Sequence, residues 1–273
     1  MKIQIDELTF NLTVSQNQNK NSIPIVMLHG FGGNRKDWDS IREKLNEHFN
    51  TIAVDLIGHG ESSSPPDLKY YSAQSIIEQL NRLFANLKLE KFILLGYSMG
   101  GRAALSYAVN LPEKISALIL ESTSPGISNQ LENEQRLRTD MLLSKKIEEN
   151  GLLSFFRDWY DQPFFESLKN NPSIDWGELI QKRINNSPIG LKNIIYEFSP
   201  GKMPDYWGEL EKFDFPVLLI NGELDKKYDA INKKAVKLLK YGTHDIIENV
   251  GHNTHLEKPS DFIKFVESFL QKN

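Results

Sequence analysis

The sequence contains no cysteine among its 273 residues. Disulfide bonds, thiol catalysis, iron–sulfur clusters and cysteine-based zinc sites are therefore excluded. No stretch approaches the roughly 18 consecutive apolar residues of a membrane helix. The N-terminal sequence MKIQIDELTFNL carries acidic residues where a signal peptide needs an apolar run. We therefore expect a cytoplasmic protein that does not span a membrane.

An excess of positive charge is also missing, because 32 Lys and Arg residues face 36 Asp and Glu residues, for a formal net charge of −4. Such a chain has no electrostatic attraction to nucleic acid, so no nucleic-acid partner is expected. The composition, 40% hydrophobic and 25% charged, is typical of a globular protein. The length fits one large domain or two small ones.

Apolar runs of strand length recur along the chain, and turn residues bound each of them. The first five are apolar on both faces, which is typical of buried strands in a parallel sheet. The runs are Pro24–His29, Thr51–Leu56, Phe92–Leu95, Ala117–Leu120, Val217–Ile220 and Asp245–Glu248. Helical patterns occupy Trp38–Phe49, Ser72–Leu87, Met99–Val109 and Pro259–Leu270. This alternation predicts a doubly wound, mostly parallel α/β sheet with helices on both faces.

No strand-like apolar run occurs between about Gly126 and Asp205, and the next one begins at Pro216. The intervening segment is polar, has a helical pattern and is punctuated by prolines. We therefore predict a helical cap of residues 126–205, inserted between two strands of a core formed by residues 1–125 and 206–273.

The strongest chemical signal is Gly96-Tyr97-Ser98-Met99-Gly100, which directly follows one buried strand and precedes a helical pattern. A sharp strand-to-helix turn exposes a serine hydroxyl above the sheet and needs small neighbours. The alternative is a plain glycine turn with an incidental serine. The strand–turn–helix context favours Ser98 as a catalytic residue.

A catalytic serine needs a base and an orienting carboxylate. His252 follows the last strand pattern, and Asp225 follows the strand Val217–Ile220, so both are expected at strand ends. We expect His255 to order its loop, and His29 and His59 to support glycine turns. Other carboxylates stay open as the acid, namely Glu223, Asp229 and Glu121. The order Ser98, Asp225, His252 is the one associated with this sheet architecture.

The glycine-rich segment Leu28–Gly33 also follows a buried strand. Backbone N–H groups in such a turn can bind an oxyanion, and we predict that Phe31 and Met99 supply the pair. The competing interpretation is a dinucleotide-binding loop. It fails because the third glycine of that pattern would stand at Arg35, so no cofactor is expected.

At this point the sequence resembles the α/β-hydrolase superfamily. The resemblance rests on HGFGG, DLIGHGES, GYSMGG, NGELD and VGHNTHLEKP, which fall in the family's order over nearly the whole chain. It implies the α/β-hydrolase fold and a Ser98–His252–Asp225 triad. It says little about the substrate, because this fold hosts many chemistries.

The positions of the arginines indicate which kind of substrate the site could bind, because arginine is rare in this chain, with only 8 Arg against 24 Lys. Arg102 lies four residues after Ser98, on the same face of a predicted helix that is otherwise small and apolar. A guanidinium there is costly unless an anion pairs with it. Two interpretations stay open: a clamp for a substrate carboxylate, or a buried structural salt bridge.

Within the superfamily, the chain resembles one branch, the 2-succinyl-6-hydroxy-2,4-cyclohexadiene-1-carboxylate synthases of menaquinone biosynthesis. The resemblance rests on GYSMGGR, SPGI, an arginine in the following cap helix, FRDWYDQPFF and a later cap arginine. It implies five substrate-binding residues: Tyr97, Arg102, Arg136, Trp159 and Arg183.

The same resemblance implies a lyase that eliminates pyruvate from a small tricarboxylate, with Ser98 acting as a base. No metal and no organic cofactor would be needed, and a monomer is favoured. The main alternative is a carboxylesterase or carbon–carbon bond hydrolase that forms an acyl-serine. A non-enzymatic binding protein of this fold and a structural protein are further alternatives, which the complete triad disfavours.

Overall fold

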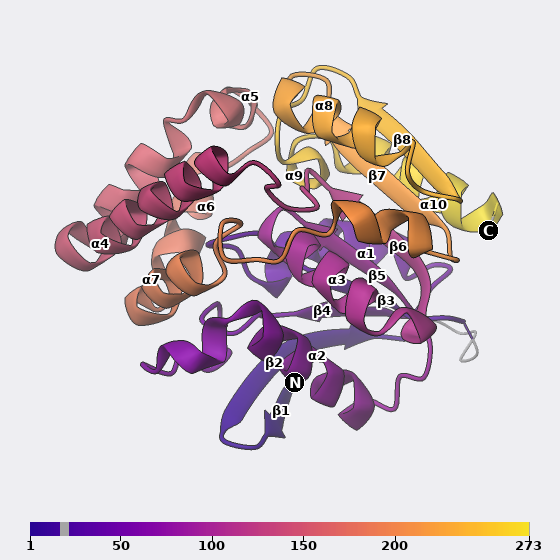
Figure 1. The fold of residues 1–273 in the computed structure, drawn as a ribbon, viewed down its shortest axis with the longest axis horizontal. Coiled ribbons are helices and arrows are strands. Elements are labelled where there is room, and N and C mark those ends of the chain that lie inside the picture. Colours follow the sequence, from indigo (N-terminus) through magenta and orange to yellow (C-terminus); the bar gives the residue numbers. More distant parts are fainter. Residues whose placement is uncertain (17–21, 273) are drawn as a thin grey trace.

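The computed structural model describes residues 1–16 and 22–272, which form one sheet covered by helices on both sides (Figure 1). The eight strands lie in the order β1-β2-β4-β3-β5-β6-β7-β8. Their bounds are β1 Lys2–Ile5, β2 Leu8–Ser15, β3 Ile25–Leu28, β4 Thr51–Val54, β5 Phe92–Tyr97, β6 Ile115–Glu121, β7 Val217–Gly222 and β8 Gly242–Ile247. The six strands from β3 to β8 pair in parallel, whereas β1 and β2 pair antiparallel.

The predicted fold class is therefore confirmed, and six of the eight strands were expected. Successive side chains of the buried parallel strands point to opposite faces of the sheet. Val26 and Leu28 of β3 pack with one group of helices, and Ile25 and Met27 pack with the other. Hydrophobic cores on both faces explain why these strands are apolar throughout.

Helices α2 (Ala73–Asn86), α3 (Met99–Asn110) and α8 (Lys226–Ala235) contribute to the core on one face. Helices α1 (Asp39–Leu45) and α10 (Pro259–Lys272) contribute to the core on the other face. The short α9 (Thr254–Glu257) precedes α10. None of the helices in the described part of the chain is long and apolar enough to cross a membrane.

Four helices lie in the chain between β6 and β7: α4 Gln130–Tyr160, α5 Glu166–Lys169, α6 Trp176–Ile184 and α7 Pro188–Glu197. In Figure 1 they stand to one side of the sheet. They share a hydrophobic cluster of their own, built around Phe155, Phe156 and Leu191. Within α4 the backbone leaves helical geometry at Gly151 (φ 71°, ψ 171°). The exact borders of a cap at residues 126 and 205 stay a prediction.

The junction between β5 and α3 is the tightest part of the fold. Ser98 occupies it with φ 50° and ψ −107°, a backbone conformation that non-glycine residues rarely adopt. Two residues later, a Cβ on Gly100 would collide with the backbone carbonyl oxygens of Leu28 and His29. Gly100 therefore lets α3 approach β3 closely enough to form the turn.

We predict that Gly100→Ala lowers the free energy of unfolding by about 2 kcal/mol or more, because backbone atoms cannot yield as a flexible side chain would. Gly208→Ala is the matched control, since a Cβ there meets no atom within 4 Å, and its effect should stay within about 0.5 kcal/mol. Urea unfolding of both variants tests this. Equal stabilities would contradict the close approach at Gly100.

Candidate active site

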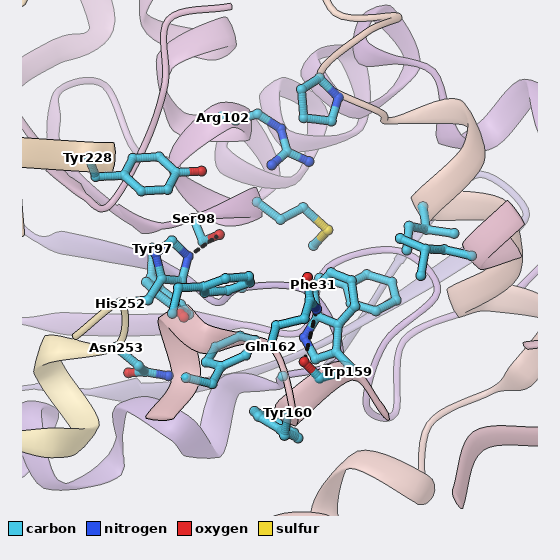
Figure 2. A pocket seen from close by; sticks show the side chains of 18 of the residues that line it. Phe31, Tyr97, Ser98, Arg102, Trp159, Tyr160, Gln162, Tyr228, His252 and Asn253 are labelled. Atoms are coloured by element: carbon cyan, nitrogen blue, oxygen red, sulfur yellow. Dashed lines mark hydrogen bonds between the residues drawn. The ribbon is translucent and has the colours of Figure 1, made fainter. Parts of the chain in front are cut away.

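Three side chains from separate parts of the chain meet after the ends of β5, β7 and β8, and Figure 2 shows two of them, Ser98 and His252. Asp225 follows β7 and caps α8, accepting a hydrogen bond from the backbone N–H of Tyr228 at 3.3 Å. His252 follows β8, and its Nδ1 lies 2.6 Å from Asp225 Oδ2. Its Nε2 lies 3.1 Å from Ser98 Oγ. The structure thus brings together the three residues that the sequence nominated as a triad.

The alternative acids have other partners. Glu121 accepts hydrogen bonds from Thr254 Oγ1 at 2.7 Å, from the backbone N–H of His255 at 3.0 Å and from His255 Nδ1 at 2.7 Å. Glu223 accepts one from the backbone of Asn249, and Asp229 pairs with Lys233. Among the described residues, Asp225 is therefore the carboxylate that hydrogen-bonds His252.

The remaining buried histidines have structural contacts. His255 stacks on Trp38 with ring centroids 4.1 Å apart. Burial holds the pKa of His59 well below its usual value, so this ring is neutral and its Nε2 accepts the Gly32 backbone N–H at 3.1 Å. His29 Nε2 accepts from the Leu56 N–H at 3.0 Å. These bonds fix the glycine turns, as expected from the sequence.

The predicted oxyanion donors lie at the edges of this site. Phe31 belongs to the turn after β3, and Met99 is the first residue of α3. Both line the same cavity as Ser98. No backbone hydrogen bond of either N–H group occurs among the residues that the structure describes, so both are available to a ligand. Their role as an oxyanion hole stays a prediction.

A cavity of about 440 Å³ lies between the strand ends and the helices of residues 130–197. All five predicted substrate-binding residues line it, namely Tyr97, Arg102, Arg136, Trp159 and Arg183. Trp159 packs on Phe31 with centroids 5.2 Å apart and forms part of an aromatic wall. Aromatic walls with a few polar groups are usual for small-molecule sites.

The ring of Tyr97 lies against the imidazole of His252. The same ring contacts His252 and His255, with centroids 5.4 Å and 5.0 Å apart. Burial raises the pKa of the Tyr97 phenol well above its usual value, so the hydroxyl keeps its proton and can donate a hydrogen bond.

Arg102 has no carboxylate partner within ion-pair distance in the described part of the chain. One terminal nitrogen donates to the Phe198 carbonyl oxygen at 3.0 Å, and the guanidinium lies over the Phe198 ring at 5.3 Å. Its Nε is buried and has no hydrogen-bond partner. Burial, and then the nearby charge of Arg136, lower the pKa of Arg102 to about 10. These contacts do not support the interpretation of Arg102 as half of a structural salt bridge.

The two arginines from the helices between β6 and β7 differ from Arg102, because each already has an aspartate. Arg136 Nε lies 2.7 Å from Asp140 Oδ2. Arg183 Nη1 lies 2.9 Å from Asp37 Oδ2, with both side chains buried, and its Nε donates to the Tyr160 hydroxyl at 2.8 Å. Burial alone would raise the pKa of Asp37, but the charge and the hydrogen bond of Arg183, together with the nearby His29 and His255, lower that pKa on balance.

Sequence reasoning missed two cavity residues in the first turn of α8, Lys227 and Tyr228. The available signal was their position directly after Asp225, in a helix that the apolar pattern did not reveal. Among the described residues, no group of three or more metal-ligating side chains is arranged to hold a metal ion.

Comparisons with known proteins agree with this geometry. A family model for the alpha/beta hydrolase fold matches residues 23–259. A relative from Bacillus subtilis (strain 168) is 39% identical over 246 residues, which are 90% of this chain and 89% of the relative, and it is provisionally named 2-succinyl-6-hydroxy-2,4-cyclohexadiene-1-carboxylate synthase. A relative with the same name from Citrobacter koseri (strain ATCC BAA-895 / CDC 4225-83 / SGSC4696) is 29% identical over 90% of this chain and 93% of its own length.

A solved structure of MenH from S. aureus superposes with a TM-score of 0.91, is 32% identical in sequence, and covers 96% of this chain and 98% of its own. These matches extend across both the sheet and the helices that line the cavity. The chain therefore belongs to the α/β hydrolase fold family, and within it to the group that includes the 2-succinyl-6-hydroxy-2,4-cyclohexadiene-1-carboxylate synthases.

Proposed function

We propose that this chain is a carbon–oxygen lyase of menaquinone biosynthesis. It would eliminate pyruvate from 2-succinyl-5-enolpyruvyl-6-hydroxy-3-cyclohexene-1-carboxylate to give 2-succinyl-6-hydroxy-2,4-cyclohexadiene-1-carboxylate, the product for which the relatives are named. The observation that carries the proposal is the guanidinium of Arg102, which lines the Ser98 cavity and has no carboxylate of the described chain within ion-pair distance. An arginine in this state favours an anionic ligand over a neutral ester.

The reaction begins with removal of a proton from the ring carbon next to the succinyl ketone. Ser98 Oγ is the base, and it passes its own proton to His252 Nε2, 3.1 Å away. Asp225, 2.6 Å from His252 Nδ1, stabilises the imidazolium that forms. The strained backbone at Ser98 presents Oγ to the cavity instead of to α3.

The electrons from the broken C–H bond make the ketone oxygen an enolate oxygen. The N–H groups of Phe31 and Met99 would donate to it, which would stabilise charge where it develops. Return of those electrons shifts the ring double bond and breaks the C–O bond to the enolpyruvyl group. The departing pyruvate enolate takes up the proton that His252 holds, so the triad ends the cycle in its starting state.

The second candidate function is ester hydrolysis through an acyl-serine. The favouring observation is that a hydrogen-bonded Ser98–His252–Asp225 triad with two free N–H donors can also attack a carbonyl carbon. Pyruvate release from the enolpyruvyl cyclohexene, measured beside hydrolysis of a short-chain nitrophenyl ester, separates the two. Ester turnover without pyruvate release would overturn the lyase proposal.

We predict that Ser98→Ala, Asp225→Asn and His252→Ala each lower kcat for pyruvate release by about 10³-fold or more. Since the three act as a unit, a double variant should lose little more than the worse single one. Glu223→Gln is the matched control, because Glu223 contacts Asn249 and not His252, and it should stay within about twofold. An Asp225→Asn variant with near-normal kcat would refute the assignment of the acid.

If Ser98 acts as a base, the kinetics of the first turnover should differ from those of an enzyme that forms an acyl-serine. Because no bond forms between Ser98 and the substrate, rapid-quench kinetics should show no burst of pyruvate, and intact-protein mass spectrometry should find no adduct. An adduct on Ser98 that forms and decays at the turnover rate with the enolpyruvyl substrate would establish covalent catalysis instead.

The unequal pairing of the arginines predicts unequal effects on stability. Arg183→Ala leaves Asp37 buried without its partner, so the free energy of unfolding should fall by about 3–5 kcal/mol. Arg102→Ala strands no carboxylate and should change it by less than about 1 kcal/mol, while kcat/KM falls about 10- to 150-fold through loss of a charge-assisted contact to substrate.

Chemical denaturation and steady-state kinetics of both variants test this difference. Arg138→Ala is the control, because Arg138 forms an exposed pair with Glu134, and such pairs contribute little. A large loss of stability in Arg102→Ala would mean that this arginine holds the fold.

A further inference from the structure

Tyr228, in the first turn of α8, lies between the Ser98–His252–Asp225 triad and Arg102. Arg102 forms no ion pair with a carboxylate of the described residues. Tyr228 lies three residues after Asp225, and its backbone N–H donates to Asp225 Oδ1 at 3.3 Å. Its ring contacts the ring of His252, with centroids 4.9 Å apart. Two members of the triad therefore fix the backbone and the ring of Tyr228.

The hydroxyl of Tyr228 has no such anchor. Among the described residues it takes part in no hydrogen bond of the protein, although the side chain lines the cavity. Figure 2 shows the phenol pointing inward, with its oxygen on the side of Arg102 and above Ser98. A tyrosine hydroxyl in such a wall usually has a partner, and here the cavity is where a partner can come from.

The guanidinium of Arg102 is a second group in the cavity that could bind a ligand. No carboxylate of residues 1–16 or 22–272 lies within ion-pair distance of it, whereas Arg136 and Arg183 pair with Asp140 and Asp37. A carboxylate bound beside Arg102 would accept from the guanidinium through one oxygen and could accept from a phenol through the other.

We infer that Tyr228 is a substrate-binding residue, whose hydroxyl and the Arg102 guanidinium hold one carboxylate of the substrate together. The inference rests on the proposed function for the identity of the substrate. It gives the phenol a specificity role: the ring supports His252, and the hydroxyl selects a substrate that carries an anion at this position.

Tyr228→Phe separates the two roles, because it keeps the ring against His252 and removes only the hydroxyl. We expect kcat/KM for pyruvate release to fall about 10- to 100-fold, chiefly through a higher KM, with an unchanged melting temperature. Tyr241→Phe is the control, since Tyr241 is 49% exposed at the surface and should behave as the wild type. A kcat/KM of Tyr228→Phe within twofold of wild type, or equal losses of activity and stability, would overturn the inference.

If Tyr228 and Arg102 hold the same carboxylate, the effects of their substitutions should not be independent. When Tyr228→Phe and Arg102→Ala are combined, the fold losses should not multiply, because the second change removes contacts to an anion already released. Losses that multiply fully would show that the two side chains act on different groups.

Calorimetric titration with two stable probes tests binding without turnover. The probes are 2-succinylbenzoate, which carries the ring and succinyl carboxylates, and pyruvate, which carries the third. Both variants should weaken the same probe, and the methyl ester of the contacted carboxylate should bind wild type and variants alike. Weakening of different probes, or of neither by Tyr228→Phe, would refute the shared site. Because these titrations need no catalysis, they remain decisive even if the wild type releases no pyruvate and the proposed function fails.

Discussion

The hydrogen bond between Asp225 and His252 depends on the parallel register of β6, β7 and β8. Leu118 of β6 lies opposite Val217 of β7, which lies opposite Gly242 of β8, so the three strands end at one edge of the sheet. Glu121 ties this edge together, because its carbonyl oxygen accepts the Ser98 N–H at 2.9 Å while its carboxylate holds the loop after His252. Glu121 thus positions Ser98 through its backbone and the loop of His252 through its side chain.

Charge balance gives the cavity its chemical character. Arg136 and Arg183 each form an ion pair with a neighbouring aspartate, so most of their positive charge is compensated within the protein. Within the described part of the chain, the guanidinium of Arg102 contacts a carbonyl oxygen and an aromatic face and no carboxylate. An overall acidic chain can therefore still hold a local site for an anion, because one unpaired guanidinium in a place of low polarity exerts a stronger attraction than several exposed lysines.

The parts that the sequence predicted are local. The β5–Ser98–α3 turn follows from glycine spacing, and five buried strands follow from continuous apolar runs. The hairpin of β1 and β2 escaped because in β2 the apolar residues alternate with polar ones such as Thr9 and Asn11 and form no continuous apolar run, and α8 escaped because it carries few apolar residues. The sequence also did not reveal the ion-pair partners of the arginines. Asp37 and Arg183, for example, are 146 residues apart, and no spacing rule connects positions so distant.

The same triad geometry is compatible with hydrolysis and with elimination, so the surrounding charges must decide between them. A carboxylate beside Arg102 would have been an easy source of stability, since a partly buried guanidinium loses much of its hydration. Among the described residues no carboxylate lies within ion-pair distance of it, so the cost of burying the guanidinium is not offset, and burial, followed by the nearby charge of Arg136, lowers the pKa of Arg102 to about 10. Binding of an anion relieves that cost only when the substrate is in place. A guanidinium able to bind an anion therefore lies in the same cavity as Ser98, and under the proposed function it would bind a carboxylate of the substrate beside the C–H bond that Ser98 attacks.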